Sequence, residues 1–247
     1  LLLDAGHVKR EEKELVCHAP NHSTVLVDGQ GPPDKYELAM VGADAWLTDW
    51  EVRAEWKTVV SSTSYAGADR ARRVVLFPGD WLLIHDRIDA AESHAWDWLL
   101  HGHGGGTSGD FLPLAGGGRW SRPGAWVQAE VAAVGGVLGC GQHEDNHSFS
   151  YGQVETHTVL DCAWTGPARD VLALVRFGPA AAAPPEDAEV ETGAGRAALR
   201  FTGADGDVVV VARDGAGTGS VETPCGDVPA DGALQVVVCA TVDAEPV

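Results

Sequence analysis

The segment Arg73-Val74-Val75-Leu76-Phe77-Pro78-Gly79-Asp80-Trp81-Leu82-Leu83-Ile84 decides the fold class of this chain. Two apolar runs of matching length lie on either side of Pro78-Gly79-Asp80, and these three residue types favour a tight turn. The pattern therefore predicts two antiparallel strands joined as a β-hairpin.

Similar short runs recur through the 247 residues and are separated by clusters of Gly, Pro, Asp and Ser. Runs rich in β-branched and aromatic residues are typical of strands. We expect strands at Thr24–Val27, Arg73–Phe77, Trp81–Ile84, Ala95–Leu100, Trp126–Val131, Val171–Phe177, Val208–Ala212 and Leu234–Ala240. Because helical patterns are scarce between them, the chain is predicted to be all-β, an antiparallel β-sandwich rather than a series of βαβ units.

The segment His94–His101 shows an alternation of period two. It places His94, Trp96, Trp98 and Leu100 on one face of a strand, and Asp97 and His101 on the other. A helix is the alternative interpretation, because a short apolar run fits either structure.

The stretch Ala180–Pro185 is the best candidate for a linker, because it is built of alanine and proline. We expect residues 1–180 to form the main sandwich body. Residues 181–247 are expected to form either its final strands or a small C-terminal β subdomain. The chain opens on Leu1 and its single methionine is Met40, so we expect a fragment or a processed product of a longer protein.

The charge of the chain excludes two classes of partner. Seventeen basic residues against thirty-six acidic ones give a net charge of −19. Such a chain repels nucleic acid and anionic membranes, so we expect neither as a partner. No apolar run approaches the ~18 residues of a membrane-spanning helix. The five cysteines form no CxxC pair, and we expect buried free thiols, although their number allows one disulfide.

Asp4 and His22 are the first candidates for a metal site. Each follows or precedes a strand-like apolar run, and the charged loop Lys9–Glu14 between them allows the two runs to return as neighbours. Imidazole and carboxylate are the usual ligands of zinc in proteins, but two ligands do not complete a zinc site. The alternative is a turn-capping aspartate and a hydrogen-bonded core histidine.

Other histidines lie in two further groups. His143-Glu144-Asp145-Asn146-His147 is dense in ligand types, with Asp161 on the next expected strand, but we interpret it as a solvated polar loop. His101 and His103 lie beside the glycine loop Gly104–Gly106, where they are candidates for a cleft wall, with packed core imidazoles as the alternative.

A carbohydrate ligand would need aromatic stacking and a cation. Nine tryptophans are present, and most are expected in the core, whereas Trp46 and Trp50 lie in a polar stretch and are the better surface candidates. Arg72 lies in the basic group Arg70, Arg72 and Arg73, which would bind a substrate carboxylate despite the negative net charge. Ordinary pairing with surface acids is the alternative for these arginines.

Several of these residues resemble the C-terminal β-sandwich of the heparinase II/III-like polysaccharide lyases. The family pattern of a strand ending in Asp-x-Gly, a loop, and then His-Asn-Thr-Val-x-Val-Asp-Gly is matched by Leu2-Leu3-Asp4-Ala5-Gly6 and His22-Ser23-Thr24-Val25-Leu26-Val27-Asp28-Gly29. The hairpin Arg73–Arg87, the segment Leu99-Leu100-His101 and Ser150-Tyr151-Gly152 resemble later strands. The similarity spans residues 1–180, and Ser23 departs from the usual asparagine.

The resemblance implies the C-terminal part of a lyase that cleaves uronic-acid-containing glycans, such as glycosaminoglycan or alginate, by β-elimination. It implies an N-terminal α/α-toroid as partner, which would supply most catalytic residues and which this chain lacks. It also implies a structural zinc held by Asp4 and His22, with a third ligand upstream of residue 1, and favours a secreted or periplasmic location. Trp46, Trp50, Arg72 and His101 are the residues that we predict to bind the acidic polysaccharide.

Two other functions fit the sequence. One is a non-catalytic carbohydrate-binding sandwich, in which exposed tryptophans hold the ligand. The other is a metal-dependent enzyme that uses His101, His103 and the histidines around His143. A third pattern, His143-x-Asp145-x-x-Ser148-Phe149, is similar to the upstream histidine strand of the family, and we interpret it as a coincidence unless the chain is permuted.

Overall fold

The computed structural model describes residues 15–16, 18–32, 45–193, 195–203, 206–213, 220–223, 226–229 and 234–240. One short 3₁₀ turn, η2 (Ala19–Asn21), precedes a series of antiparallel strands. The strands are β1 (Val25–Val27), β2 (Ala45–Val52), β3 (Lys57–Tyr65), β4 (Ala68–Leu76), β5 (Trp81–Ala90), β6 (His94–His101), β7 (Asp110–Leu114), β8 (Gly117–Arg122), β9 (Ala125–Ala133), β10 (Gly139–Ser150), β11 (Gln153–Gly166), β12 (Val171–Pro179), β13 (Glu189–Gly193), β14 (Arg196–Gly203), β15 (Gly206–Arg213), β16 (Ser220–Thr223), β17 (Gly226–Pro229) and β18 (Leu234–Ala240).

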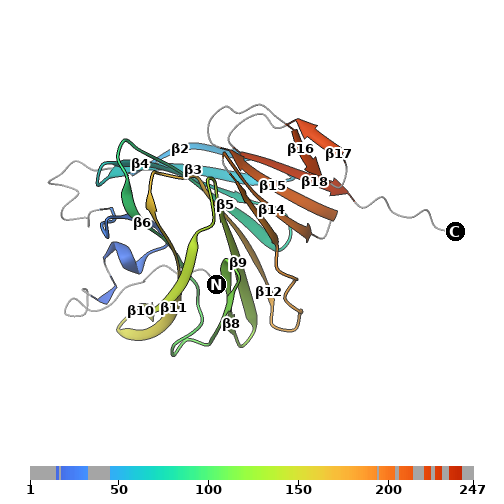
Figure 1. Ribbon diagram of the computed structural model, residues 1–247. Coiled ribbons are helices and arrows are strands. Elements are labelled where there is room, and N and C mark those ends of the chain that lie inside the picture. The colour runs from blue at the N-terminus through green and yellow to red at the C-terminus, as the bar shows by residue number, and fades with distance from the viewer. Residues whose placement is uncertain are drawn as a thin grey trace.

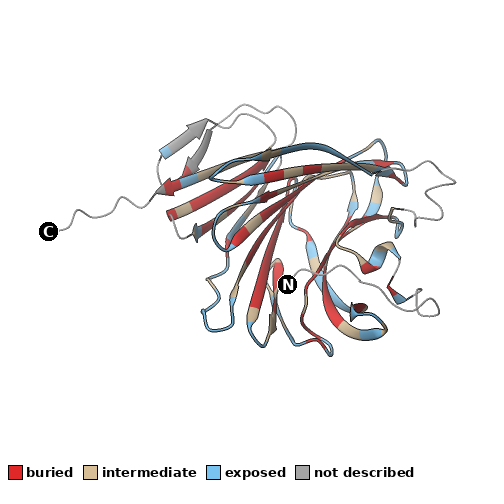
Figure 2. Ribbon diagram, turned by 180° about the vertical axis from the view of Figure 1, so that it is seen from behind, coloured by how far each residue is buried: buried red, intermediate tan, exposed pale blue. Residues whose placement is uncertain are grey.

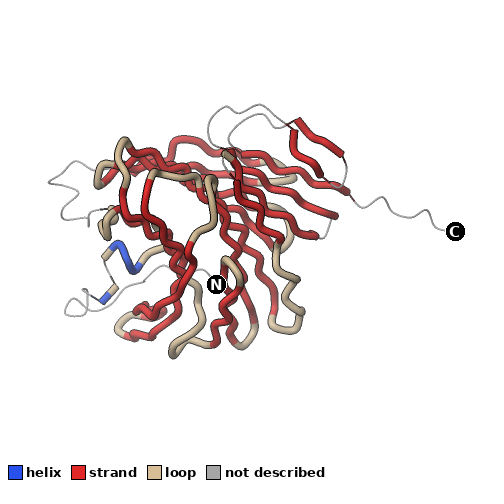
Figure 3. Tube along the Cα trace, viewed as in Figure 1, coloured by secondary structure: helices blue, strands red, loops and turns tan. Residues whose placement is uncertain are grey.

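The strands form three stacked sheets (Figures 1 and 3). The first sheet has the order β1-β6-β11-β10, and the central sheet has the order β2-β3-β4-β5-β12-β9-β8-β7. A third sheet, β13-β14-β15-β18, lies against the other face of the central sheet, with the ribbon β16-β17 beside it. The predicted all-β antiparallel sandwich is confirmed.

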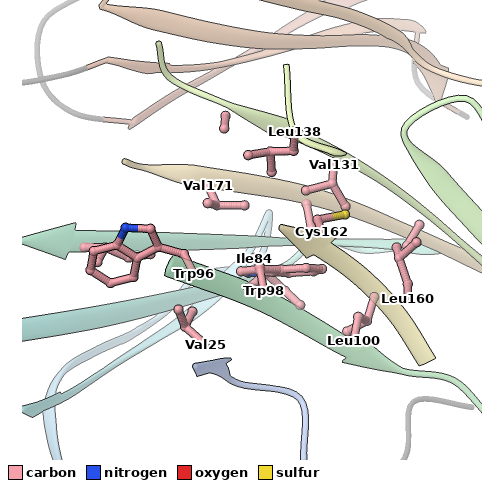
Figure 4. Close-up of a cluster of buried hydrophobic side chains, with 14 of the residues drawn as sticks. Val25, Ile84, Trp96, Trp98, Leu100, Val131, Leu138, Leu160, Cys162 and Val171 are labelled. Carbon is pink, nitrogen blue, oxygen red and sulfur yellow. The ribbon is translucent and has the colours of Figure 1, made fainter. Parts of the chain in front are cut away.

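The main core lies between the first and central sheets (Figure 4). Trp96, Trp98 and Leu100 of β6 point into it and are almost fully buried, as the alternation in the sequence predicts. Leu99 of the same strand belongs to a separate cluster on the opposite face. The helical alternative for this segment is wrong, because the segment is a strand that pairs with β1 on one side and β11 on the other.

A second core joins the central sheet to the third sheet. Leu83 and Leu172 of the central sheet pack with Leu199 and Val210 of the third sheet, and all four side chains are fully buried. Figure 2 shows that the buried residues follow the strands on both sides of the central layer. The division into a main body of residues 1–180 and a remainder of residues 181–247, either final strands of the same sandwich or a small β subdomain, stays a prediction.

The predicted hairpin is present, because β4 and β5 pair with each other across Phe77–Asp80. Gly79 has a φ of 108°, in the region that glycine reaches without strain. The other predicted runs also lie in strands, and the strand expected at Asp161 is β11, whereas β10 was not predicted.

Asp86 is fully buried at the centre of the main core, where it joins three strands. Arg72 of β4 donates to both carboxylate oxygens, at 2.8 and 2.6 Å, and Trp98 Nε1 of β6 donates to Oδ2 at 2.7 Å. Arg70 Nε lies 3.5 Å from Oδ1. Burial by itself raises the pKa of Asp86, but Arg72 and Arg70 outweigh it and lower that pKa to about 2.

The cysteines differ from the expectation of free thiols. Cys140 of β10 and Cys162 of β11 face each other across the hairpin and form a disulfide, and Cys239 is also disulfide-bonded. Cys17 and Cys225 lie outside the described residues. The expectation was wrong because sequence spacing does not reveal which cysteines become cross-strand neighbours. No helix among the described residues is long and apolar enough to cross a membrane.

The Asp86→Asn variant is expected to unfold more readily at neutral pH by roughly 3–5 kcal/mol, because Arg72 and Arg70 lose their buried partner. The native pKa of Asp86 is below its unfolded value of 3.8, so its contribution is present above about pH 4. That contribution falls away between about pH 4 and pH 2. Urea titrations across this range should show the gap between wild type and variant narrowing as the pH falls. Asp89→Asn, at an exposed position of β5, is the control, and equal pH profiles for the two variants would contradict this role.

The double variant Cys140→Ala/Cys162→Ala is expected to lose roughly 3 kcal/mol of unfolding free energy, because the bond closes a loop with a sequence separation of 22. Chemical denaturation under oxidising conditions measures this. A loss below about 1 kcal/mol would show that the hairpin is held by pairing alone.

Candidate functional site

A buried histidine cluster lies on the outer face of the first sheet. We use this name for His101, His103, His147 and His157 together with Glu155. In β10 and β11, residues directly opposite one another share a face, and His147 pairs with Glu155 in the register. His157 lies two residues further along β11, and His101 of β6 pairs with the next outer-face residue of that strand. The sheet alternation therefore gathers side chains from three strands.

Three of the histidines form a chain of short contacts. His101 Nδ1 lies 2.8 Å from His157 Nε2, and His157 Nδ1 lies 3.1 Å from His147 Nδ1. All three rings are completely buried. In a neutral imidazole one nitrogen carries a proton and the other accepts a hydrogen bond. The choice of protonated nitrogen on one of these three histidines therefore fixes the choice on the next.

The far end of the chain meets a carboxylate. His147 Nε2 lies 3.9 Å and His103 Nε2 lies 4.0 Å from Glu155 Oε2. Neither nitrogen has a hydrogen-bond partner, and both atoms are buried. Ser108 Oγ lies 3.0 Å from the same Glu155 oxygen and 2.8 Å from the Thr156 carbonyl oxygen, and its single hydroxyl proton can be donated to either acceptor.

The loop after β6 positions His103. A Cβ at Gly102 would lie only 2.2 Å from the Trp120 ring, so this position requires glycine for the loop to approach β8. Gly105 has a φ of 77° and passes close to Thr158 of β11. Arg122 Nη1 contacts His103 Nδ1 at 2.7 Å. The loop that begins at Gly102 thus brings His103, one of the two candidates for a cleft wall, to the cluster.

Burial lowers the pKa of the cluster imidazoles. It is the largest cause of the lowering to about 3 for His101 and to about 4 for His157, with repulsion from neighbouring histidines adding to it. Burial and the Arg122 charge lower the pKa of His103 to about 4, and burial also lowers that of His147. The rings are therefore neutral at physiological pH, which is the form that binds metals.

The covering segment, which we define as η2 and the residues that follow it to Thr24, lies over this outer face. Asn21 Nδ2 donates to both carboxylate oxygens of Asp145, at 2.9 and 2.8 Å. Ser23 Oγ accepts from the backbone N–H of His101 at 3.1 Å, and the Ser23 carbonyl accepts from Arg72 Nη1 at 2.6 Å. His22 lies close enough for its charge to lower the pKa of His101.

The structure separates the predicted site residues. His22 lies beside the histidine cluster, whereas Asp4 lies outside the described residues. His101 is completely buried in the histidine chain, and Arg72, whose side chain is 12% exposed, is paired with Asp86. Trp46 and Trp50 are 60% and 72% exposed on β2, at the edge of the central sheet.

The segment His143–His147 is part of strand β10, so its interpretation as a solvated loop was wrong. The side chains of this segment alternate between the two faces of the sheet, and the odd-numbered residues face η2 and the histidine cluster. His143 Nδ1 lies 3.6 Å from Asp161 Oδ2, apart from the His103, His147 and Glu155 group. Glu155 and His157 were missed by the sequence analysis, although Glu-x-His in an alternating run is a signal that could have found them.

A cavity of about 510 Å³ lies next to Trp46. Its walls include the aromatic side chain of Trp46, the cation Arg87 and the two carboxylates Asp69 and Asp89, and they are completed by Ser62, Thr63, Ser64, Arg70 and Ala71. The Arg70 guanidinium itself points to the other face of the central sheet, where it donates to Thr24 Oγ1 at 2.6 Å.

A larger cavity of about 990 Å³ lies between the central and third sheets. Its walls include Trp56, Phe77 and Trp81, and its one histidine, His85, is paired with Asp170 at 3.0 Å. Because these walls are mainly the apolar faces of two packed sheets, we place the candidate site at the histidine cluster and the Trp46 cavity.

The family model "Heparinase II/III-like, C-terminal" matches residues 5–223. Among solved structures, a heparinase III described as the BT4657 gene product has a TM-score of 0.66 at 12% identity, over 86% of this chain and 34% of that one. Heparan sulfate lyase HepC from Pedobacter heparinus has a TM-score of 0.55 at 13% identity, over 89% and 30%.

Another structure, a heparinase III, has a TM-score of 0.61 at 11% identity, over 83% of this chain and 31% of that one. At such identities the likeness shows a common fold. The chain spans about a third of the length of these solved structures. No curated protein sequence matches it.

Proposed function

This chain belongs to the heparinase II/III-like, C-terminal family, and from that premise we propose that it is the sandwich part of a lyase for uronic-acid-containing polysaccharides. The observation that carries the proposal is the family match over residues 5–223. The fold likeness to a heparan sulfate lyase and to heparinase III supports a glycosaminoglycan of the heparan sulfate type as the substrate class.

The reaction of such a lyase is a β-elimination. A base removes the C5 proton of the uronate, the bond between C4 and the glycosidic oxygen breaks, a C4–C5 double bond forms, and an acid protonates the departing oxygen. We propose that an N-terminal α/α-toroid supplies the base and the acid. The chain then contributes one wall of the substrate cleft.

The Trp46 cavity has the chemistry for one acidic sugar. The Trp46 ring offers a stacking face, and Arg87 is an exposed cation on the same cavity wall. Ser62 and Ser64 add hydroxyl groups. Trp50 lies further along the exposed edge strand β2, but a register shift between Leu47 and Asp49 places it opposite Val59 on the other face of the sheet, so it is not part of this cavity.

Arg72 and His101 have a less direct part in the proposal. Arg72 is engaged by Asp86 and the Ser23 carbonyl, and His101 is completely buried. Contact with a polysaccharide would require both to leave these networks. We therefore propose that they position the segment that covers the histidine cluster, while Arg87 meets the carboxylate.

A metal at the family position would be held by Asp4, His22 and a ligand from the preceding part of the protein. His22 offers a half-buried imidazole next to other neutral histidines, a donor that zinc accepts. Zinc there would tie the covering segment to the cleft. The Cys140–Cys162 disulfide supports a secreted or periplasmic setting, where thiols oxidise.

The second candidate function is a carbohydrate-binding sandwich without catalysis. The 60% and 72% exposure of Trp46 and Trp50 favours it, because exposed aromatic rings on a strand edge bind sugars without any acid or base. Both functions use the same surface. They are distinguished by whether the longer protein, which includes the proposed N-terminal toroid, has lyase activity.

Trp46→Ala and Arg87→Gln are each expected to weaken binding of a heparan sulfate oligosaccharide by roughly 3- to 10-fold, the effect of losing one stacking or charge-assisted contact. Isothermal titration calorimetry on residues 1–247 measures this. Tyr151→Ala is the matched control, because Tyr151 is 71% exposed but lies in the turn between β10 and β11. Equal losses in all three variants would argue against the Trp46 cavity.

The lyase assignment is tested by activity. We expect the longer protein, with its helical region, to release unsaturated uronate that absorbs in the ultraviolet, and we expect residues 1–247 alone to release none. Trp46→Ala in the longer protein should raise KM more than it lowers kcat, since stacking binds substrate and transition state alike. Sugar binding without elimination by the longer protein would leave only the binding module.

A further inference from the structure

We propose that His103, His147 and Glu155 form a metal site for a zinc-type divalent cation, separate from the Asp4 and His22 position. The ligand atoms of these three side chains lie within 4.8 Å of one another. Within the part of the chain that the structure describes, they form the one such group of three or more potential ligands. The group joins the loop after β6 to the β10-β11 hairpin.

The spacing matches an ion after a small contraction. Zinc bonds of about 2.1 Å in a tetrahedral site place ligand atoms about 3.4 Å apart. Here the two imidazole nitrogens lie 3.9 and 4.0 Å from the Glu155 oxygen. Glu155 is partly exposed, and its flexible side chain can move inward by the remaining distance.

The hydrogen bonds of the cluster leave a place for a cation. His147 is completely buried, and its Nε2 has no hydrogen-bond partner. If Nε2 carries the proton, the Glu155 oxygen at 3.9 Å is too distant to accept it. If Nε2 is the free acceptor, it faces a carboxylate that is also an acceptor. A cation between them satisfies both groups.

Metal binding would fix the proton order along the histidine chain. With a cation on His147 Nε2, the Nδ1–H of that ring donates to His157 Nδ1. His157 then carries its proton on Nε2 and donates to His101 Nδ1. His157 is thus the hydrogen-bonded partner that orients a metal ligand, an arrangement that strengthens metal binding.

Arg122 competes with the ion for His103. Its Nη1 donates to His103 Nδ1 at 2.7 Å, which keeps the ring proton on Nε2. Coordination through Nε2 requires the proton to move to Nδ1 and Arg122 to turn toward solvent. The positive charge of Arg122 also opposes a cation. Removing this side chain should therefore tighten metal binding, which a purely structural role of the cluster would not produce.

The ligand set is two imidazoles and one carboxylate. This set with a free fourth position is the arrangement that zinc adopts where it keeps a water or an exchangeable ligand. The side chains of His103 and Glu155 are partly exposed, at 20% and 27%, so the site is open to solvent on one side. We therefore expect an exchangeable ion rather than one sealed in during folding.

The test measures binding of Zn²⁺ to residues 1–247 by equilibrium dialysis, and of Co²⁺ by its visible absorption, after metal removal with a chelator. Glu155→Gln and His103→Gln are each expected to weaken binding at this site by at least about tenfold, the lower end of what losing even a ligand's supporting partner costs. Arg122→Ala is expected to tighten it.

His143→Ala is the matched control, because His143 lies on β10, is exposed, and belongs to the Asp161 pair. His22→Ala separates the two metal positions. Loss of binding in Glu155→Gln but not in His22→Ala supports the new site whether or not the family position is occupied. Loss in His22→Ala alone overturns the new site and leaves the family position intact.

Unchanged Zn²⁺ and Co²⁺ binding in both Glu155→Gln and His103→Gln would also overturn the proposal. Thermal unfolding in metal-free buffer checks that each variant is folded. Glu155→Gln keeps the size of a partly exposed side chain, so it tests the site even if replacing the buried His147 disrupts the sheet.

Discussion

The buried carboxylate of Asp86 is the interaction on which the rest of this structure depends. It draws Arg72 and Arg70 of β4 and Trp98 of β6 to one point inside the main core. Both arginines have donors left over, and these reach the Ser23 carbonyl and the Thr24 hydroxyl. A charge network in the core thereby fixes the segment that covers the outer face of the first sheet. An arginine left without a partner inside the core would strongly destabilise the fold. The contacts of the two arginines therefore make this segment an integral part of the fold.

The architecture could be predicted because local patterns and tertiary burial agree. In His94–His101, the alternation that puts Trp96 and Trp98 on one face is the same alternation that buries them between two sheets. In Arg73–Ile84, the turn residues interrupt two runs that are apolar because the strands on either side are covered. The local sequence of these segments specifies both the strand and its buried face, so they could be predicted from a single sequence.

The β10-β11 hairpin could not be found in this way. Its outer face carries His143, Asp145 and His147, which by composition resemble a solvated loop. These residues are in a strand because Asn21, distant in sequence, bonds Asp145, and because His101 and His157 satisfy one another across strands. The same limit applies to Cys140 and Cys162, whose pairing depends on the register of the hairpin. The structure of this hairpin depends on partners that are distant in the sequence, and the local pattern of apolar and polar residues does not reveal such partners.

The central sheet separates the two parts of the candidate site. Ala71 of β4 pairs with Arg87 of β5, so these two residues share the face that carries the Trp46 cavity. Arg70 pairs with Ile88, whose side chain belongs to the main core, and the Arg70 guanidinium contacts Asp86 and Thr24 on that other face. A sugar bound beside Arg87 would therefore leave the Asp86 network undisturbed. The segment that covers the histidine cluster is held from the core side, because Arg72 donates to the Ser23 carbonyl and Ser23 Oγ accepts from the backbone N–H of His101. The proposed sugar surface and the proposed metal site can thus be altered independently by mutation.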